Sequence, residues 1–243
     1  MRATFAFALV LVATPALAGP PYVTDDPEPT DLGKWEVFAY GEGTRFRSHS
    51  YEAETGFDIN YGAAKDLQVT TVLPVAIEHE DGQMRSGLGD VELGAKYMFI
   101  HQQDGTVVPD ISFYPTMTLP TAHHGLGSGK VGAFFPLWAQ KDIGAWSMFG
   151  GGGYAINPNK DAKDSWLVGY AITRQLTDKF NLGAEIYHET ADEVGGKPGT
   201  GLGLGMVYDL NEKWSILASG GPMLEHRDAT GRYAFYMSLA FHD

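Results

Sequence analysis

The stretch Arg-Tyr-Ala-Phe-Tyr-Met-Ser-Leu-Ala-Phe-His, residues 232–242, alternates between apolar side chains and side chains that are mostly small or polar. Because a β-strand sends successive side chains to opposite faces, this pattern predicts a strand with one apolar face. A tilted strand needs about nine to eleven residues to cross a bilayer, and this stretch has that length. It therefore predicts the last strand of a transmembrane β-barrel. The predicted lipid-facing side chains are Tyr233, Phe235, Met237, Leu239 and Phe241.

The composition agrees with this reading. Hydrophobic residues make up 44% of the chain, as in many soluble proteins. A barrel has this composition because only every second strand residue faces lipid. No run of eighteen apolar residues follows the N-terminal segment, which excludes a helical membrane protein. The chain has 31 glycines and no cysteine, so it contains neither a thiolate metal site nor a cysteine nucleophile.

The N-terminus has the pattern of a secretory signal peptide. Arg2 supplies a short charged start, an apolar run follows, and Ala16-Leu17-Ala18 matches a cleavage site. We therefore predict that residues 1–18 are removed. Loss of Arg2 leaves 16 basic and 30 acidic residues, a net charge of −14. This charge disfavours nucleic acid and anionic membrane surfaces as partners.

Residues 19–32 form a segment rich in proline and acidic residues, which predicts no regular secondary structure. It is either a disordered periplasmic start or an ordered stub that folds into the barrel mouth, and the pattern favours the first. The barrel itself is predicted to occupy residues 33–243.

Twelve strands are predicted from residue 34 onward, and the connections between them alternate between short and long. Such alternation is typical of an up-and-down antiparallel barrel with periplasmic turns and extracellular loops. It predicts that both termini lie on the periplasmic side. The predicted strands are 34–46, 53–62, 67–78, 88–100, 107–119, 130–140, 144–156, 165–176, 180–190, 200–210, 214–224 and 232–242.

Charged strand residues fall almost wholly on the face opposite the apolar one. A basic residue on the lipid face costs about 2–4 kcal/mol at the bilayer midplane, which explains the segregation. Arg45 and Arg174 are exceptions near strand ends. The predicted lumen-lining side chains are Glu36, Tyr40, Asp58, Glu92, Lys96, Asp110, Tyr114, Trp138, Glu185, Tyr187, Glu189, Asp209, Arg232 and Tyr236. Aromatic residues beside the short turns predict a girdle at the periplasmic interface: Tyr61, Phe99, Trp146, Phe180, Tyr208 and Trp214.

Several short motifs resemble a known family. They are PYVTDDP at 21–27, GKWE at 33–36, LP at 73–74, GLGDV at 87–91 and GAKY at 94–97. With them the chain resembles the outer-membrane proteins of the phenol degradation meta-pathway family over essentially its whole mature length. The resemblance implies a barrel in the outer membrane of a Gram-negative bacterium, linked to uptake of aromatic or other apolar solutes. One departure is that His242 and Asp243 follow Phe241, where many such proteins end on the aromatic residue.

Motifs that could indicate chemistry are weak. Residues 201–205, Gly-Leu-Gly-Leu-Gly, lack the spacing of a dinucleotide fingerprint and fit small inward residues of a barrel wall. Residues 127–130 lack the first glycine and the Ser/Thr of a phosphate loop. Residues 150–153, four glycines, favour a kink or bulge. His123 and His124 have no third ligand placed by the sequence. We therefore predict no metal and no cofactor.

A lipid or ester hydrolase is a less favoured alternative. Catalysis by such an enzyme needs a serine and a histidine on the same face of the wall. His188 faces outward on its predicted strand, whereas Ser165 on the neighbouring strand faces inward. We therefore expect no enzyme.

The function predicted from the sequence is a porin-like, passive channel or transporter. Its lumen would be narrow, partly aromatic and acidic, which suits small apolar or aromatic solutes. The alternative is a structural or plugged barrel without transport. The predicted partners are the lipid bilayer and such solutes.

Overall fold

The computed structural model describes residues 21–46, 50–80, 82–123 and 125–243. The predicted signal peptide, residues 1–18, lies outside them, as do Gly19, Pro20 and His124. Within the described residues the regular elements are all β-strands. No helix in this part of the chain has the length and apolar character needed to cross a membrane.

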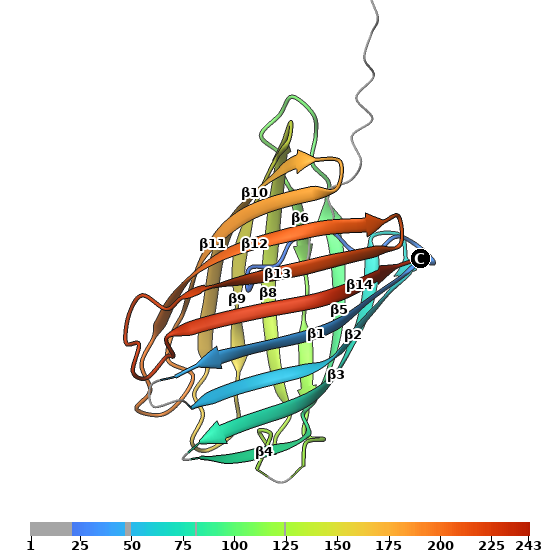
Figure 1. Ribbon diagram of the computed structural model, residues 1–243. Coiled ribbons are helices and arrows are strands. Elements are labelled where there is room, and N and C mark those ends of the chain that lie inside the picture. The colour runs from blue at the N-terminus through green and yellow to red at the C-terminus, as the bar shows by residue number, and fades with distance from the viewer. Residues whose placement is uncertain (1–20, 47–49, 81, 124) are drawn as a thin grey trace, which may run out of the picture.

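The strands close into a single antiparallel barrel with twelve wall strands, which we call staves; a stave can consist of two strand segments (Figure 1). Strands that follow each other around the wall are antiparallel neighbours, β4 with β5 and β6 with β7 each occupying one position in the wall, and β1 pairs with β14 to close the barrel. The predicted all-β, up-and-down barrel of twelve strands is therefore confirmed. Its strands are β1 Trp35–Arg45, β2 Tyr51–Ala64, β3 Leu67–Glu80, β4 Gln83–Leu88, β5 Val91–Ile100, β6 Asp110–Phe113, β7 Thr116–Leu119, β8 Gly132–Ile143, β9 Trp146–Ile156, β10 Ser165–Thr177, β11 Phe180–Glu189, β12 Gly199–Asn211, β13 Trp214–Pro222 and β14 Tyr233–His242.

Two of the twelve staves are interrupted, which raises the number of strand segments to fourteen. The predicted strand 107–119 is β6 and β7, broken at Tyr114 and Pro115. Proline has no N–H to donate to a neighbouring strand, so the ladder is broken there. The other interrupted stave is β4 with β5, broken at Gly89 and Asp90.

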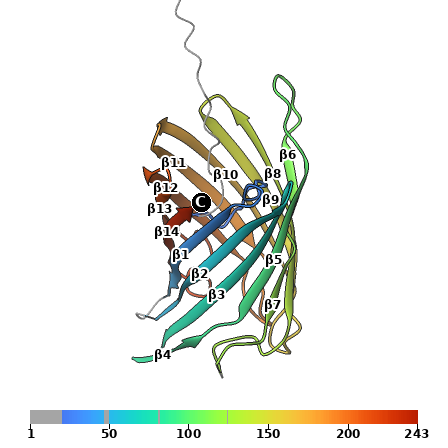
Figure 2. The ribbon, with the colours of Figure 1, turned by 90° about the vertical axis from the view of Figure 1, so that its right-hand side faces the viewer.

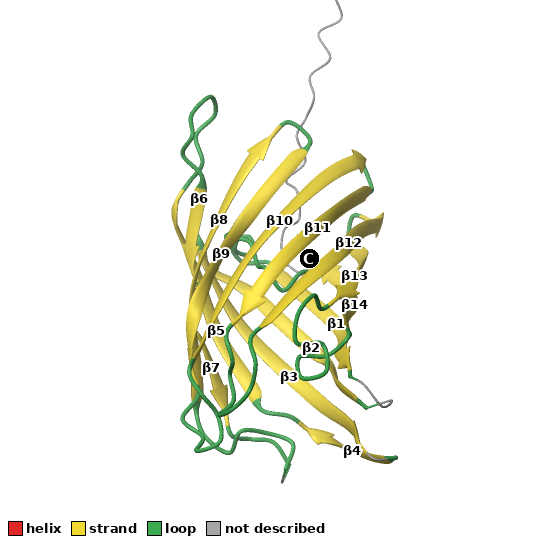
Figure 3. Cartoon of the chain, turned by 90° about the vertical axis from the view of Figure 1, so that its left-hand side faces the viewer, coloured by secondary structure: helices red, strands yellow, loops and turns green. Residues whose placement is uncertain are grey.

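Two connections differ from the prediction. The stretch from His79 to Gly87, predicted as a long loop, is mostly a hairpin, because β3 continues to Glu80 and β4 pairs with it. On the periplasmic side, residues 101–109 form a longer connection than residues 101–106, which the predicted strands leave between them. Figure 3 shows the remaining long loops gathered at the opposite, extracellular end of the barrel.

The two faces of β14 match the alternation read from residues 232–242. Phe235 and Met237 are 52% and 62% exposed, whereas Ser238 and Ala240 are 4% and 0% exposed. Large apolar side chains are exposed in the same way on strands all around the barrel. An apolar belt outside a closed barrel is the surface that a bilayer covers, and it places the protein in the outer membrane.

Aromatic residues at the periplasmic strand ends form ring contacts consistent with the predicted girdle. Phe180 contacts Tyr208 across β11 and β12, and Trp214 contacts Phe241 across β13 and β14. Arg174, an outward charge, lies with its guanidinium carbon 5.1 Å from the ring centroid of Trp146. This cation–π contact reduces the cost of a charge near the lipid boundary.

A kink or a bulge was predicted at residues 150–153, and the bulge is not found. These residues pair with β8 and β10 without a register shift. Their side-chain positions are instead filled by neighbouring backbone. A Cβ atom on Gly151 would lie 2.0 Å from the carbonyl oxygen of Leu137, and one on Gly152 would lie 2.1 Å from that of Leu167. Glycine is therefore required by close strand packing.

Candidate functional site

The lumen contains a cavity of about 860 Å³. It runs from the inner wall to the extracellular loops, where Leu126, Asn157 and Glu193 contribute to its lining. A second cavity of about 400 Å³ lies beside it and is lined by residues of β1, β2 and β11 to β14. The lumen is thus partly open on the extracellular side.

Most of the side chains predicted to line the lumen lie on these two cavities. The larger cavity is lined by Glu36, Tyr40, Asp58, Glu92, Lys96, Tyr114, Trp138, Glu189 and Tyr236. Glu185, Tyr187 and again Tyr236 line the smaller one. The structure therefore places these residues around the two cavities.

Three predicted lumen residues line neither cavity. Asp110 lies at the start of β6 and accepts a hydrogen bond from the backbone N–H of Gln102 at 2.7 Å. Asp209 accepts a hydrogen bond from the Ser215 hydroxyl at 2.6 Å. Arg232 is exposed in the connection that precedes β14, because the strand begins at Tyr233. This last assignment needs correction, since an inward parity holds only within a strand.

The described part of the N-terminal segment, residues 21–32, lies inside the barrel (Figure 2). Thr24, Asp26 and Pro27 are almost completely buried there. A parallel bridge between Leu32 and Gly62 fixes the segment where it enters the lumen from the periplasmic side. Of the two alternatives left by the sequence, the ordered stub is the one observed for these residues, and we call them the plug.

Glu185 of β11 holds the inner end of the plug. Its two carboxylate oxygens accept hydrogen bonds from the backbone N–H groups of Val23 and Thr24, at 3.2 and 3.0 Å. The hydroxyl of Ser219 donates to the carbonyl oxygen of Pro21. These bonds satisfy backbone groups that would otherwise be buried without partners.

Lys96 of β5 provides the ionic contact between wall and plug. Its Nζ atom lies 3.1 Å from Oδ1 of Asp25 and donates a weaker bond to the carbonyl oxygen of Glu28 at 3.5 Å. Lys96 itself is only 4% exposed. A buried amine of this kind depends on its partners, because water does not solvate it.

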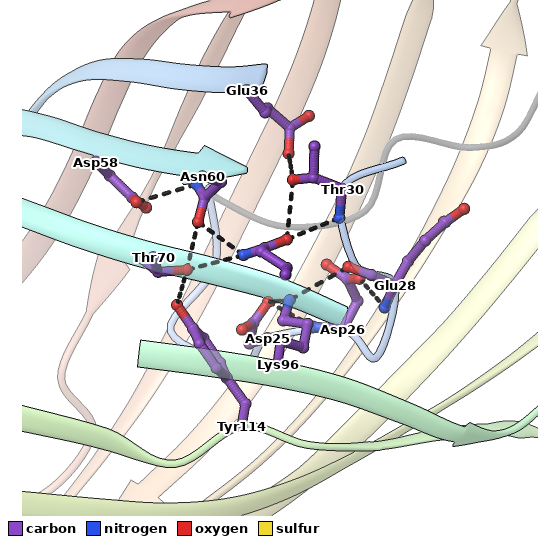
Figure 4. A network of polar contacts seen from close by, with 11 residues as sticks. Asp25, Asp26, Glu28, Thr30, Glu36, Asp58, Asn60, Thr70, Lys96 and Tyr114 are labelled. Atoms are coloured by element: carbon purple, nitrogen blue, oxygen red, sulfur yellow. Dashed lines mark hydrogen bonds and ion pairs between the residues drawn. The ribbon is translucent and has the colours of Figure 1, made fainter. Parts of the chain in front are cut away.

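A hydrogen-bond network joins the outer end of the plug to the wall (Figure 4). The backbone N–H and the hydroxyl of Thr30 both donate to Gln68 Oε1, at 2.8 and 2.9 Å. Gln68 in turn donates to Asn60 Oδ1 at 2.7 Å, and the Tyr114 hydroxyl donates to Thr70 at 3.0 Å. Side chains on β2, β3 and the β6–β7 break thus hold the same segment.

Glycines on the opposite wall form a cradle for the plug, which we define as Gly169, Gly183 and Gly205. A Cβ atom on Gly169 would lie 2.1 Å from the Thr24 hydroxyl oxygen. One on Gly205 would lie 2.5 Å from the Tyr22 ring, and one on Gly183 would lie 2.5 Å from the Tyr22 hydroxyl oxygen. Sequence reasoning missed this role, although the Gly-Leu-Gly-Leu-Gly stretch was its signal.

The plug carries four acids, Asp25, Asp26, Glu28 and Asp31, and no basic residue. Burial raises the pKa of the Asp26 carboxyl, an effect larger than the lowering by Lys96. Burial, together with repulsion from Asp142 and Asp110, raises the pKa of Glu28 to about 7. We therefore expect the seated plug to bind protons, so that seating weakens as pH rises from the ordinary carboxyl range towards 7.

The arrangement gives no support to a hydrolase at Ser165 and His188. Ser165 is 1% exposed, and its hydroxyl lies 3.4 Å from Glu189. His188 contacts Thr200 on the other face of the wall, with Nδ1 2.8 Å from the hydroxyl oxygen. In the described part of the chain no group of three or more acidic or histidine side chains is arranged to hold a metal ion.

Comparison with known proteins gives both a family and a fold. A family model described as "Putative MetA-pathway of phenol degradation" matches residues 67–239. The crystal structure of an outer membrane channel from Pseudomonas putida F1 is similar, with a TM-score of 0.69 at 14% sequence identity over 89% of this chain and 97% of that chain. The translocator domain of the autotransporter NalP from Neisseria meningitidis gives a TM-score of 0.45 at 13% identity over 87% and 88%. No curated protein sequence matches the chain.

The closed barrel and its apolar belt define an outer-membrane β-barrel protein. The chain belongs to the MetA-pathway phenol degradation family, as its N-terminal and Gly-Leu-Gly-Asp motifs predicted.

Proposed function

We propose that the protein is a passive channel for small aromatic or apolar solutes, in which the plug controls passage. The observation that carries this proposal is the lumen cavity, which opens among the extracellular loops and ends at the plug. Rings of Phe38, Tyr40 and Tyr236 line it beside carboxylates. Such a lining offers stacking surfaces to a planar solute.

The plug also favours a second candidate, a structural barrel that is permanently closed. Its contacts are numerous, and Asp26 is completely buried. The two candidates differ in whether the seated plug can leave the lumen. Conductance across a lipid bilayer decides between them.

An open pore should prefer cations to anions. The larger cavity is lined by acids from many elements, including Glu36, Glu54, Asp58 and Glu92, and Lys96 is the one basic residue among the described residues of its lining. A wall of one sign concentrates counter-ions in a confined space. The reversal potential of the refolded protein in a KCl gradient should therefore have the sign that K⁺ selectivity gives.

The preference should weaken as salt rises, because the screening length falls from about 10 Å at 0.1 M to about 3 Å at 1 M. Glu92→Gln should reduce it, whereas Glu212→Gln, in a short periplasmic turn, serves as the matched control. Chloride selectivity of the unmodified protein would show that the acids do not line the conducting path.

A further inference from the structure

The ammonium group of the Lys96 side chain shows how the lumen surrounds a cation. It lies 3.1 Å from the Asp25 carboxylate and 5.0 Å from the ring centroid of Tyr114. The group is thus held by a carboxylate on one side and an aromatic face on the other. This is the environment that proteins use for organic ammonium ligands.

The larger cavity repeats this pairing without a cation of its own. The rings of Tyr40 and Tyr236 are nearly parallel, with centroids 6.3 Å apart and planes 7° apart. The hydroxyl of Tyr40 donates to Glu54, and Glu42 lines the same cavity. Lys96 is the only basic side chain among the described residues of this lining, and Asp25 already pairs with it.

The site has the size and the access that a small ligand needs. Its volume of about 860 Å³ lies within the range of about 300–1,000 Å³ found for ligand cavities. Ser128, Asn159 and Glu193 of the extracellular loops border it, so entry from outside does not require the plug to move.

We propose that this cavity binds small organic cations, namely arylalkylamines in their protonated, ammonium form. The ammonium is placed at Glu42 and Glu54, and the ring packs beside Tyr40 and Tyr236. This inference refines the solute class of the proposed channel.

For solutes with the same ring, charge decides the order of their binding affinities. A neutral aromatic alcohol gains only the ring contacts. An aromatic carboxylate is repelled by the acidic lining. Only the ammonium gains both the ring contacts and the attraction of the carboxylates.

Binding is measured by equilibrium dialysis of refolded, detergent-solubilised protein against labelled benzylammonium, benzyl alcohol and benzoate. Benzylammonium should bind about tenfold more tightly than benzyl alcohol, a difference of about 1.4 kcal/mol, and benzoate should bind most weakly. The double variant Glu42→Gln, Glu54→Gln should remove most of the advantage, whereas Glu212→Gln should keep it. Tyr236→Leu should weaken benzylammonium and benzyl alcohol alike.

Equal binding of benzylammonium and benzyl alcohol, or tightest binding of benzoate, overturns the inference. This assay requires no conduction, so it separates two failures. Binding without conductance rejects the channel but keeps the cation site. Conductance without a preference for benzylammonium rejects the cation site and keeps the channel.

Discussion

Replacing Lys96 with methionine should expel the plug and open the lumen. The substitution keeps most of the length of the side chain but removes the cation that faces Asp25, Asp26 and Glu28. Removing one partner of a buried ion pair costs about 3–5 kcal/mol, because the remaining charge stays buried without compensation. The plug can avoid this cost by leaving the lumen. A shift of that size changes the ratio of seated to released plug by about 10²-fold or more.

Single-channel recording in planar bilayers measures the effect as longer and more frequent openings. The matched control is Lys213→Met, because Lys213 lies in the turn before β13 and pairs with Asp243 at an exposed site, 3.9 Å apart. Exposed pairs of this kind contribute about 0–1 kcal/mol. A folded Lys96→Met barrel that conducts no better than the unmodified protein would show that the ion pair of Lys96 with Asp25 does not hold the plug in the lumen.

Alanine at two positions of the glycine cradle should displace the plug without disturbing the barrel. The three atoms nearest to a Cβ on Gly169 all belong to Thr24, and those nearest to a Cβ on Gly205 all belong to Tyr22. The added methyl groups therefore clash with the plug and not with the wall. Overpacking costs about 1–3 kcal/mol at each site, so the double variant should release the plug in most molecules.

A single cysteine at Pro27 reports the release, because this side chain is almost completely buried and the chain has no cysteine of its own. Gly169→Ala with Gly205→Ala should increase its labelling by a water-soluble maleimide at least tenfold. Gly41→Ala is the control, since its Cβ would meet no atom closer than 3.9 Å. Slow labelling in all variants would show that the wall tolerates the methyl groups with the plug in place.

The barrel could be predicted from the sequence because its signal is local. Strand residues 232–242 show which side faces lipid without knowledge of any other strand, since side chains alternate with a period of two. The ends of strands do not follow from this alternation, as the hairpin at Glu80 to Gln83 and the exposed Arg232 show. Pairing between β3 and β4, which the alternation alone does not report, decides where such strands stop.

The sequence offered an ordered N-terminal stub only as the less favoured alternative, because the contacts that hold the plug are distant in sequence. Lys96 and Asp25 are separated by 71 positions, and Thr24 and Glu185 by 161. A segment with prolines and acids has the composition of a disordered region, and only the shape of the assembled lumen provides its partners. The inward glycines look like featureless wall until Tyr22 and Thr24 are seen against them.

The cavity could be predicted from the sequence only in part. Parity placed Tyr40 and Tyr236 on the inward face, but their parallel arrangement depends on the pairing of β1 with β14 at opposite ends of the chain. The sequence therefore predicted an acidic and aromatic lumen. It did not predict that Lys96, the only basic side chain among the described residues of the larger cavity, pairs with Asp25 of the plug.

The most direct test compares single-channel conductance of the unmodified protein with that of a chain lacking residues 21–31, in the same bilayers and the same KCl solutions. The plug is the only described segment outside the wall strands and their connections, so its removal should leave a continuous lumen. The shortened chain should show stable, cation-selective openings, and the unmodified protein should show rarer and smaller ones. Equal conductance of the two proteins, with both barrels folded, would contradict a channel controlled by this plug.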